Sequence, residues 1–117
     1  MSTIKSFTDL SQSKKLAEIL PLESADMCWT KYIDNGDITS IHATVNYGIV
    51  TIDYPCWSLA ALLSVIRRTI GYTLHGVNNV YMSCELGDFK KIETEVYDNE
   101  VDACYEMIVR LNELKRL

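Results

Sequence analysis

The chain contains few residues of the types that perform covalent or metal chemistry. Its two histidines are His42 and His75, and its four cysteines stand far apart, with no Cys-x-x-Cys pair. Zinc sites normally include ligands that lie close together in sequence. No glycine-rich phosphate loop is present either. We therefore expect no metal site and no bound cofactor.

A nucleophilic cysteine needs a base beside it. The available pairs combine Cys56 or Cys104 with His75 or His42, and no local sequence signature supports any of them. Cys104 also lies on the apolar stripe of a predicted helix, where a thiol usually acts as a small hydrophobic side chain. The sequence thus indicates no catalytic residue, and it favours a non-enzymatic protein without deciding the question.

Aromatic residues suggest a different kind of site, a contact surface, because Trp and Tyr are enriched in interface hot spots. The chain has two Trp and seven Tyr residues, and the candidates are Trp29, Tyr54, Trp57 and Tyr81. Trp57 comes just before a predicted helix, where a side chain often packs back on the first turns instead. Tyr81 is expected on the polar face of a strand, so it is a candidate for the outer surface of a sheet.

Charge narrows the range of partners. The net charge of −5 argues against nucleic acid, which requires a basic face. Between Glu85 and Glu106 there are eight acidic residues against two lysines, which indicates either a solvated surface or a negative patch for a basic partner. The longest apolar run is shorter than the ~20 residues of a membrane span, and we see no signal peptide. We expect a cytoplasmic protein without a membrane partner.

The strongest structural pattern is the segment Ser58–Ile70. Ser58 is a good N-cap, apolar residues recur at helical spacing after it, and Arg67 and Arg68 occupy the last turn. Because most of its circumference is apolar, we expect this helix to be central and the most buried of the chain.

The remaining chain predicts a single α+β domain over residues 1–117, in the order α-β-β-β-α-β-β-α. Short turns between the first three strands predict an antiparallel meander, and alternating strands predict a mainly antiparallel sheet with helices packed on one face. A further short strand is conceivable at Tyr72–His75. The other predicted helices and strands are Thr8–Pro21, Met27–Ile33, Ile38–Val45, Ile49–Tyr54, Val80–Leu86, Phe89–Tyr97 and Glu100–Leu117.

Three blocks of sequence together carry a resemblance: Ser6–Met27, Pro55–Leu63 with the motif PCWSLAALL, and Tyr97–Lys115. They resemble a family of short uncharacterised proteins from gut Bacteroides-type bacteria and their mobile elements or phages. The similarity covers about half of the chain. The family has no assigned activity and no catalytic motif, so the resemblance implies a setting and no functional residue.

Two functional hypotheses follow. The first is a non-enzymatic protein-interaction or accessory protein of a mobile element or phage, with an unidentified protein partner. The alternative is a small-molecule-binding or hydrolytic protein with a pocket beside the central helix, near Cys56, Trp57 and His75. We also expect a homodimer, formed through the C-terminal helix or through an edge strand that carries few charges, with Ile49–Tyr54 and Val80–Leu86 as candidate edges.

Overall fold

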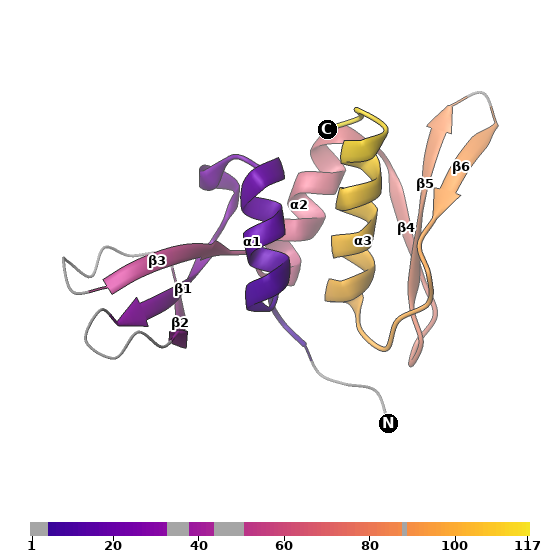
Figure 1. Ribbon diagram of the computed structural model, residues 1–117. Helices are drawn as coiled ribbons and strands as arrows, with labels where there is room; N and C mark the ends of the chain where they lie inside the picture. Colours follow the sequence, from indigo (N-terminus) through magenta and orange to yellow (C-terminus); the bar gives the residue numbers. More distant parts are fainter. Residues whose placement is uncertain (1–4, 33–37, 44–50, 88) are drawn as a thin grey trace.

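The computed structural model describes residues 5–32, 38–43, 51–87 and 89–117. In these ranges the chain forms three α-helices, a short 3-10 helix and two three-stranded antiparallel sheets. The helices lie between the two sheets (Figure 1). The α+β class is confirmed. The elements are α1 (Leu10–Ile19), η1 (Leu22–Ser24), β1 (Met27–Tyr32), β2 (Ile38–Ala43), β3 (Thr51–Cys56), α2 (Leu59–Thr69), β4 (Tyr72–His75), β5 (Tyr81–Gly87), β6 (Lys90–Glu93) and α3 (Glu100–Glu113).

Each helix begins at a polar cap. The Asp9 carboxylate accepts the Gln12 N–H at 2.8 Å, and the Gln12 side chain accepts the Asp9 N–H at 3.1 Å, which makes a capping box. Ser58 and Asn99 cap α2 and α3 by accepting the backbone N–H of the third helical residue. Three strands separate each helix from the next along the chain, and all three α-helices run in the same direction (Figure 1).

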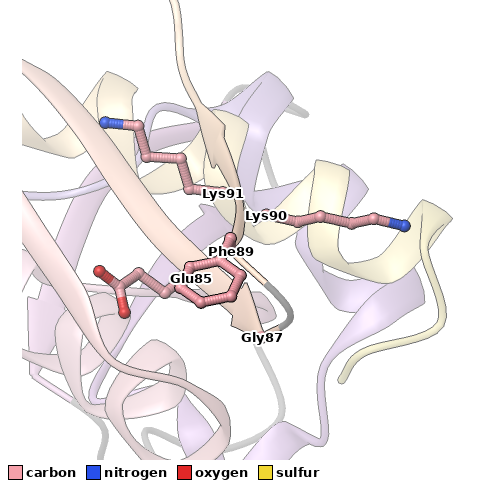
Figure 2. A pocket seen from close by; sticks show the side chains of 5 residues that line it. All are labelled: Glu85, Gly87, Phe89, Lys90 and Lys91. Carbon is pink, nitrogen blue, oxygen red and sulfur yellow. The ribbon is translucent and has the colours of Figure 1, made fainter.

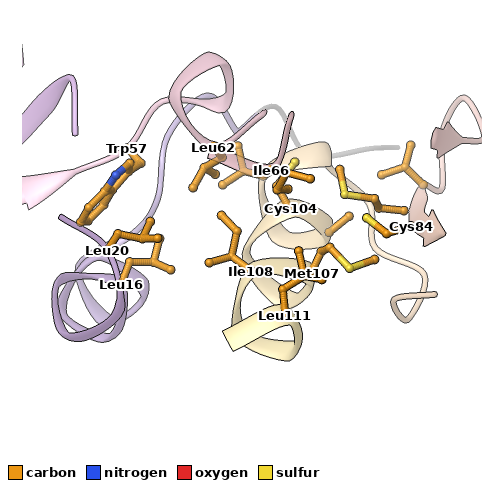
Figure 3. Close-up of a cluster of buried hydrophobic side chains, with 14 residues drawn as sticks. Leu16, Leu20, Trp57, Leu62, Ile66, Cys84, Cys104, Met107, Ile108 and Leu111 are labelled. Atoms are coloured by element: carbon orange, nitrogen blue, oxygen red, sulfur yellow. The ribbon is translucent and has the colours of Figure 1, made fainter. Parts of the chain in front are cut away.

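Helix α3, not α2, is the most buried helix. In α2 only Leu62 and Ile66 are fully buried, although its apolar circumference predicts a central position. Helix α3 contacts α2 and α1 as well as β5, so it is covered on two sides. Figure 3 shows the resulting core, in which side chains of α1, α2 and β5 gather around α3. The residues of α3 that are buried are Val101, Ala103, Cys104, Met107, Ile108 and Leu111.

The first sheet has the strand order β2-β1-β3, so the expected meander is wrong. Strand β2 ends with Ala43 opposite Met27, whereas β3 begins with Thr51 opposite Tyr32 at the other end of β1. Ala43 and Thr51 therefore lie on either side of β1 and at its opposite ends, about 20 Å apart. The seven residues between Ala43 and Thr51 can span up to about 26 Å. The length of the connection therefore permits the observed order as well as the expected meander. The expected turns at 34–37 and 46–48 lie outside the described residues.

The second sheet has the order β4-β5-β6, so the described part of the chain forms two sheets instead of the single expected one. The conceivable strand at Tyr72–His75 is formed and is an edge. Strand β6 is shorter than expected, but beyond it the Thr94 N–H still donates to the Met82 carbonyl at 2.9 Å. Among the described residues, no helix has the length and apolar composition needed to cross a membrane.

Candidate functional site

The outer face of the second sheet carries polar and aromatic side chains on all three strands. Alternation along β4 places Thr73 and His75 on the face opposite Tyr72 and Leu74, which pack against the core. The register then sets the neighbours of these residues across the sheet. Thr73 lies opposite Ser83, which lies opposite Glu93; His75 lies opposite Tyr81; and Glu85 lies opposite Lys91.

His75 is held on this face by two contacts. Its Nε2 atom lies 2.8 Å from the Ser83 hydroxyl oxygen, within hydrogen-bond distance. Its ring stacks on the Tyr81 ring, with a centroid separation of 4.4 Å and an interplanar angle of 10°. A hydrogen bond on one side and an aromatic ring on the other fix the imidazole orientation. The three side chains therefore form one rigid unit on the sheet surface.

A depression of about 560 Å³ lies beside this unit. Its lining combines small residues, such as Thr73 and Ser83, with the larger side chains of His75, Glu85 and Lys91. Residues of the edge strand β4 form part of its lining. The lining residues are Gly71, Tyr72, Thr73, His75, Ser83, Glu85 and Lys91.

A second depression adjoins the first at the β5–β6 hairpin (Figure 2). Glu85 and Lys91 line both. Phe89, at the hairpin tip, is fully exposed and has a φ of 62°, a conformation that is unfavourable for a residue with a side chain. Lys90 and Lys91 extend in different directions from the tip (Figure 2). Glu85 and Lys91, which line both depressions, thus lie between Phe89 at the tip and the His75–Tyr81 stack.

The His75–Ser83 contact favours binding over acyl transfer. Ser83 is buried, with 9% of its surface exposed, in the middle strand of the sheet. The backbone N–H groups around it belong to the ladders with β4 and β6. An oxyanion hole needs N–H groups that are free to point at a reacting oxygen. The face can therefore offer stacking and side-chain hydrogen bonds to a partner.

Of the four aromatic candidates from the sequence, Tyr81 alone lies on this face. Trp57 is fully buried in the core, and its indole N–H donates to the Ser24 hydroxyl at 2.9 Å, so it contributes nothing to an exposed contact surface. Trp29 and Tyr54 lie opposite each other on β1 and β3 and are half-buried. The Trp29 indole donates to the Thr8 carbonyl at 3.2 Å, beside the start of α1.

Sequence reasoning named His75 only as a possible base for a cysteine and as a residue near a pocket beside the central helix, and it missed Ser83 and the place of both residues on one sheet face. The signal that could have found them is alternation: positions 73 and 75, and positions 81 and 83, share a face if the two segments pair as a hairpin. Two members of the acidic run from Glu85 to Glu106 have partners within the protein. Asp102 binds Lys5, and Glu106 accepts the Tyr97 hydroxyl at 2.6 Å.

Cys56 does not meet the histidine that the hydrolytic hypothesis requires. It is fully buried, with its Sγ atom 3.5 Å from the Thr8 hydroxyl, and burial raises the pKa of its thiol. His75 instead has Ser83 and Tyr81 as its neighbours on the second sheet. The structure therefore does not bring the proposed nucleophile and base together.

None of the four cysteines forms a disulfide, and all four are buried. Burial raises the pKa of the Cys84 thiol to about 11, and burial together with the nearby Glu100 carboxylate raises that of Cys104 to about 12. Thiols with such pKa values are protonated near neutral pH and react slowly. Within the described part of the chain, no group of three or more His, Cys, Asp or Glu side chains could hold a metal ion.

Comparison with known proteins adds no relative. No family model, no curated protein and no solved structure matches the chain. The resemblance to short proteins of gut Bacteroides-type bacteria and their mobile elements stays a prediction. Function therefore rests on the geometry of the site itself.

Proposed function

We propose that the protein is a non-enzymatic interaction protein that binds an extended segment of a partner protein along β4. The observation that carries the proposal is the contrast between the two edges of the second sheet. Strand β6 exposes Lys90, Lys91 and Glu93, and such charges normally block edge pairing. Strand β4 carries no Asp, Glu, Lys or Arg, and it borders the His75–Tyr81 stack.

Strand addition explains how the face and the edge would work together. The backbone of the added segment would pair with β4, which supplies affinity without regard to sequence. Its side chains would alternate between the two faces of the sheet. Those on the outer face would lie next to Thr73 and His75 and reach the depression, which supplies selectivity. Those on the inner face would lie next to Tyr72 and Leu74, where an apolar side chain is favoured.

The setting is part of the same proposal. A cytoplasmic accessory protein of a mobile element or phage acts by occupying a surface of another protein, and it needs no catalytic group. Because Asp102 and Glu106 of the acidic run already have partners within the protein, the proposed recognition relies on strand pairing instead of on charge. A basic partner surface is therefore no longer required.

Affinity capture from a lysate of the producing organism tests this proposal. Thr73 is exposed on β4, so Thr73→Lys adds an edge charge without disturbing the core. Thr69→Lys, at an exposed position of α2, is the matched control. We expect a protein that is retained by wild type and by Thr69→Lys and is lost with Thr73→Lys, with unchanged circular dichroism. Equal retention by both variants would place the contact elsewhere.

One observation supports the alternative hypothesis that the protein binds a small molecule. A depression of about 370 Å³ lies where the C-terminal ends of the three helices meet, beside α2. Its walls include Ile19, Leu20 and Val65, and Arg68 lies at its rim. This combination suits a small amphiphilic anion. A thermal-shift screen with medium-chain carboxylates tests it: a rise in Tm that Arg68→Ala abolishes would support the alternative.

A further inference from the structure

We infer that the segment bound along β4 is the β4 strand of a second copy of this chain. Two three-stranded sheets then join across a two-fold axis into one continuous sheet. This inference rests on the proposed function, because it names the partner of the same edge. It also gives the expected homodimer a specific geometry.

The residue pattern of β4 supports a second copy as the occupant. A strand added to this edge should place apolar side chains beside Tyr72 and Leu74 and uncharged polar ones beside Thr73 and His75. Strand β4 itself has this pattern, with no like charges to repel each other across the axis. An antiparallel pair of identical strands is self-complementary, so one edge serves both copies.

Pleating limits the register to few possibilities. Residues directly opposite in an antiparallel pair point to the same face. Thr73 must therefore lie opposite either Thr73 or His75 of the second copy. In both registers a side chain of the second copy would lie beside Thr73 or His75, which line the depression. The second copy would therefore add to the lining of the depression.

Other routes to a dimer are less favourable. The apolar stripe of α3, one of the two expected interfaces, is already covered, since Cys104, Ile108 and Leu111 have no exposed surface. Strand β5, one of the two expected edges, is the middle strand of its sheet. Strand β3 is an edge, as expected, but it carries an aspartate and a proline. Strand β2 is an uncharged edge, so the test includes it.

Light scattering over a tenfold range of concentration tests the interface. We expect wild type to approach twice the chain mass of 13.3 kDa at the higher concentrations. Thr73→Lys should remain at the single-chain mass throughout, and Ser40→Lys on β2 and Thr69→Lys on α2 should behave as wild type. A Ser40→Lys variant that is monomeric, beside a dimeric Thr73→Lys, would overturn the inference.

Cross-linking then identifies the register. Because the four native cysteines are buried, a new surface thiol can be oxidised selectively. Thr73→Cys should form an intermolecular disulfide if Thr73 faces its own copy. If Thr73 faces His75, Leu74 faces Leu74 of the second copy, and Leu74→Cys, a thiol at a partly buried position, should cross-link instead. Lys90→Cys on β6 is the control and should not cross-link. Cross-linking of the control alone contradicts the inference.

The outcomes separate this inference from the proposed function. If wild type has the single-chain mass at all concentrations, but Thr73→Lys still loses a captured protein, the occupant is another protein and the inference is wrong. If Thr73→Lys changes neither the mass nor the capture, the inference and the proposed function are both wrong. If it lowers the mass and abolishes the capture, the inference and the proposed function are both supported.

Discussion

The Thr8 side chain joins the chain before α1 to the start of α2. It is fully buried, and its hydroxyl lies 2.7 Å from the Ser13 hydroxyl and accepts the Trp57 N–H at 3.2 Å. Its backbone N–H also donates to the Trp57 carbonyl at 2.9 Å. Buried polar groups are stabilising only while each has a partner. One hydroxyl therefore satisfies groups on two segments.

Thr8→Val should destabilise the protein by about 1–3 kcal/mol, because the shape is kept while the Ser13 hydroxyl and the Trp57 N–H lose their partner. Chemical denaturation at pH 7 measures the change. Thr69→Val is the matched control: Thr69 is exposed, and its hydroxyl donates to the Val65 carbonyl of its own helix. We expect the control to change stability by less than about 0.5 kcal/mol. Equal effects would mean that the Thr8 contacts contribute nothing specific.

For single residues, the sequence predicts contacts between positions that are close together in the chain. The caps Asp9, Ser58 and Asn99 were predictable because each acts on a residue three positions away. The contacts of Thr8 with Cys56 and of His75 with Ser83 were not predicted, since they depend on which segments become neighbours. The contact between Thr8 and Cys56 crosses 48 positions of sequence. Residue types alone do not specify such pairs.

Between elements, a charged network ties the N-terminal ends of α1 and α3. The Lys5 ammonium donates to Asp102 at 2.8 Å and to Asp9 at 3.2 Å, and the Gln12 amide donates to Asp102 at 2.8 Å. Burial alone would raise the pKa of Asp102, but hydrogen bonds from Lys5, Asn99 and Gln12 outweigh it and lower the pKa below its ordinary value of 3.8. The folded state therefore favours the ionised carboxylate.

Asp102→Asn should reduce stability at pH 7 by about 1 kcal/mol, because a partly exposed pair is weakened by solvent. A lowered folded-state pKa contributes stability above the unfolded value of 3.8 and loses it as pH falls through the folded value. The difference between wild type and variant should thus shrink in this acid window. Urea denaturation from pH 7 to pH 2 measures it.

Glu18→Gln is the control for the Asp102 network. Glu18 lies 4.0 Å from Lys15 in an exposed pair on α1, and its loss should cost less than about 0.5 kcal/mol. A stability difference for Asp102→Asn that stays constant from pH 7 to pH 2 would contradict a role for the ionised carboxylate.

Element types were predictable, but their neighbours were not. Helical and alternating periodicity identified the three helices and five of the six strands of the described chain. The same periodicity does not say whether β3 joins β1 or β2, because both partners present a suitable edge. It also ranked α2 above α3 in burial. The apolar share of a helix surface indicates how many of its side chains could be buried. Helix α3 buries more side chains than α2 because it lies between α2 and β5.

The whole molecule is elongated, with extents of 53 × 34 × 18 Å. Its core follows α3, between α2 and the second sheet (Figure 3). The first sheet projects to the other side and meets the helices chiefly where β3 contacts α1 (Figure 1). Stability within a protein follows the density of such contacts. The two ends of the molecule should therefore open at different free energies.

Native-state hydrogen exchange measures this difference. Amides of α3 and β5 should exchange most slowly, through global unfolding, and amides of β1 and β2 faster, through opening of the first sheet alone. Ile108→Ala removes buried methyl groups beside α2 and should cost about 2–5 kcal/mol. It should accelerate exchange in α3 and β5 while leaving β1 and β2 unchanged, since their opening does not break the core. Equal acceleration in both sheets would instead mean that the molecule unfolds as one cooperative unit.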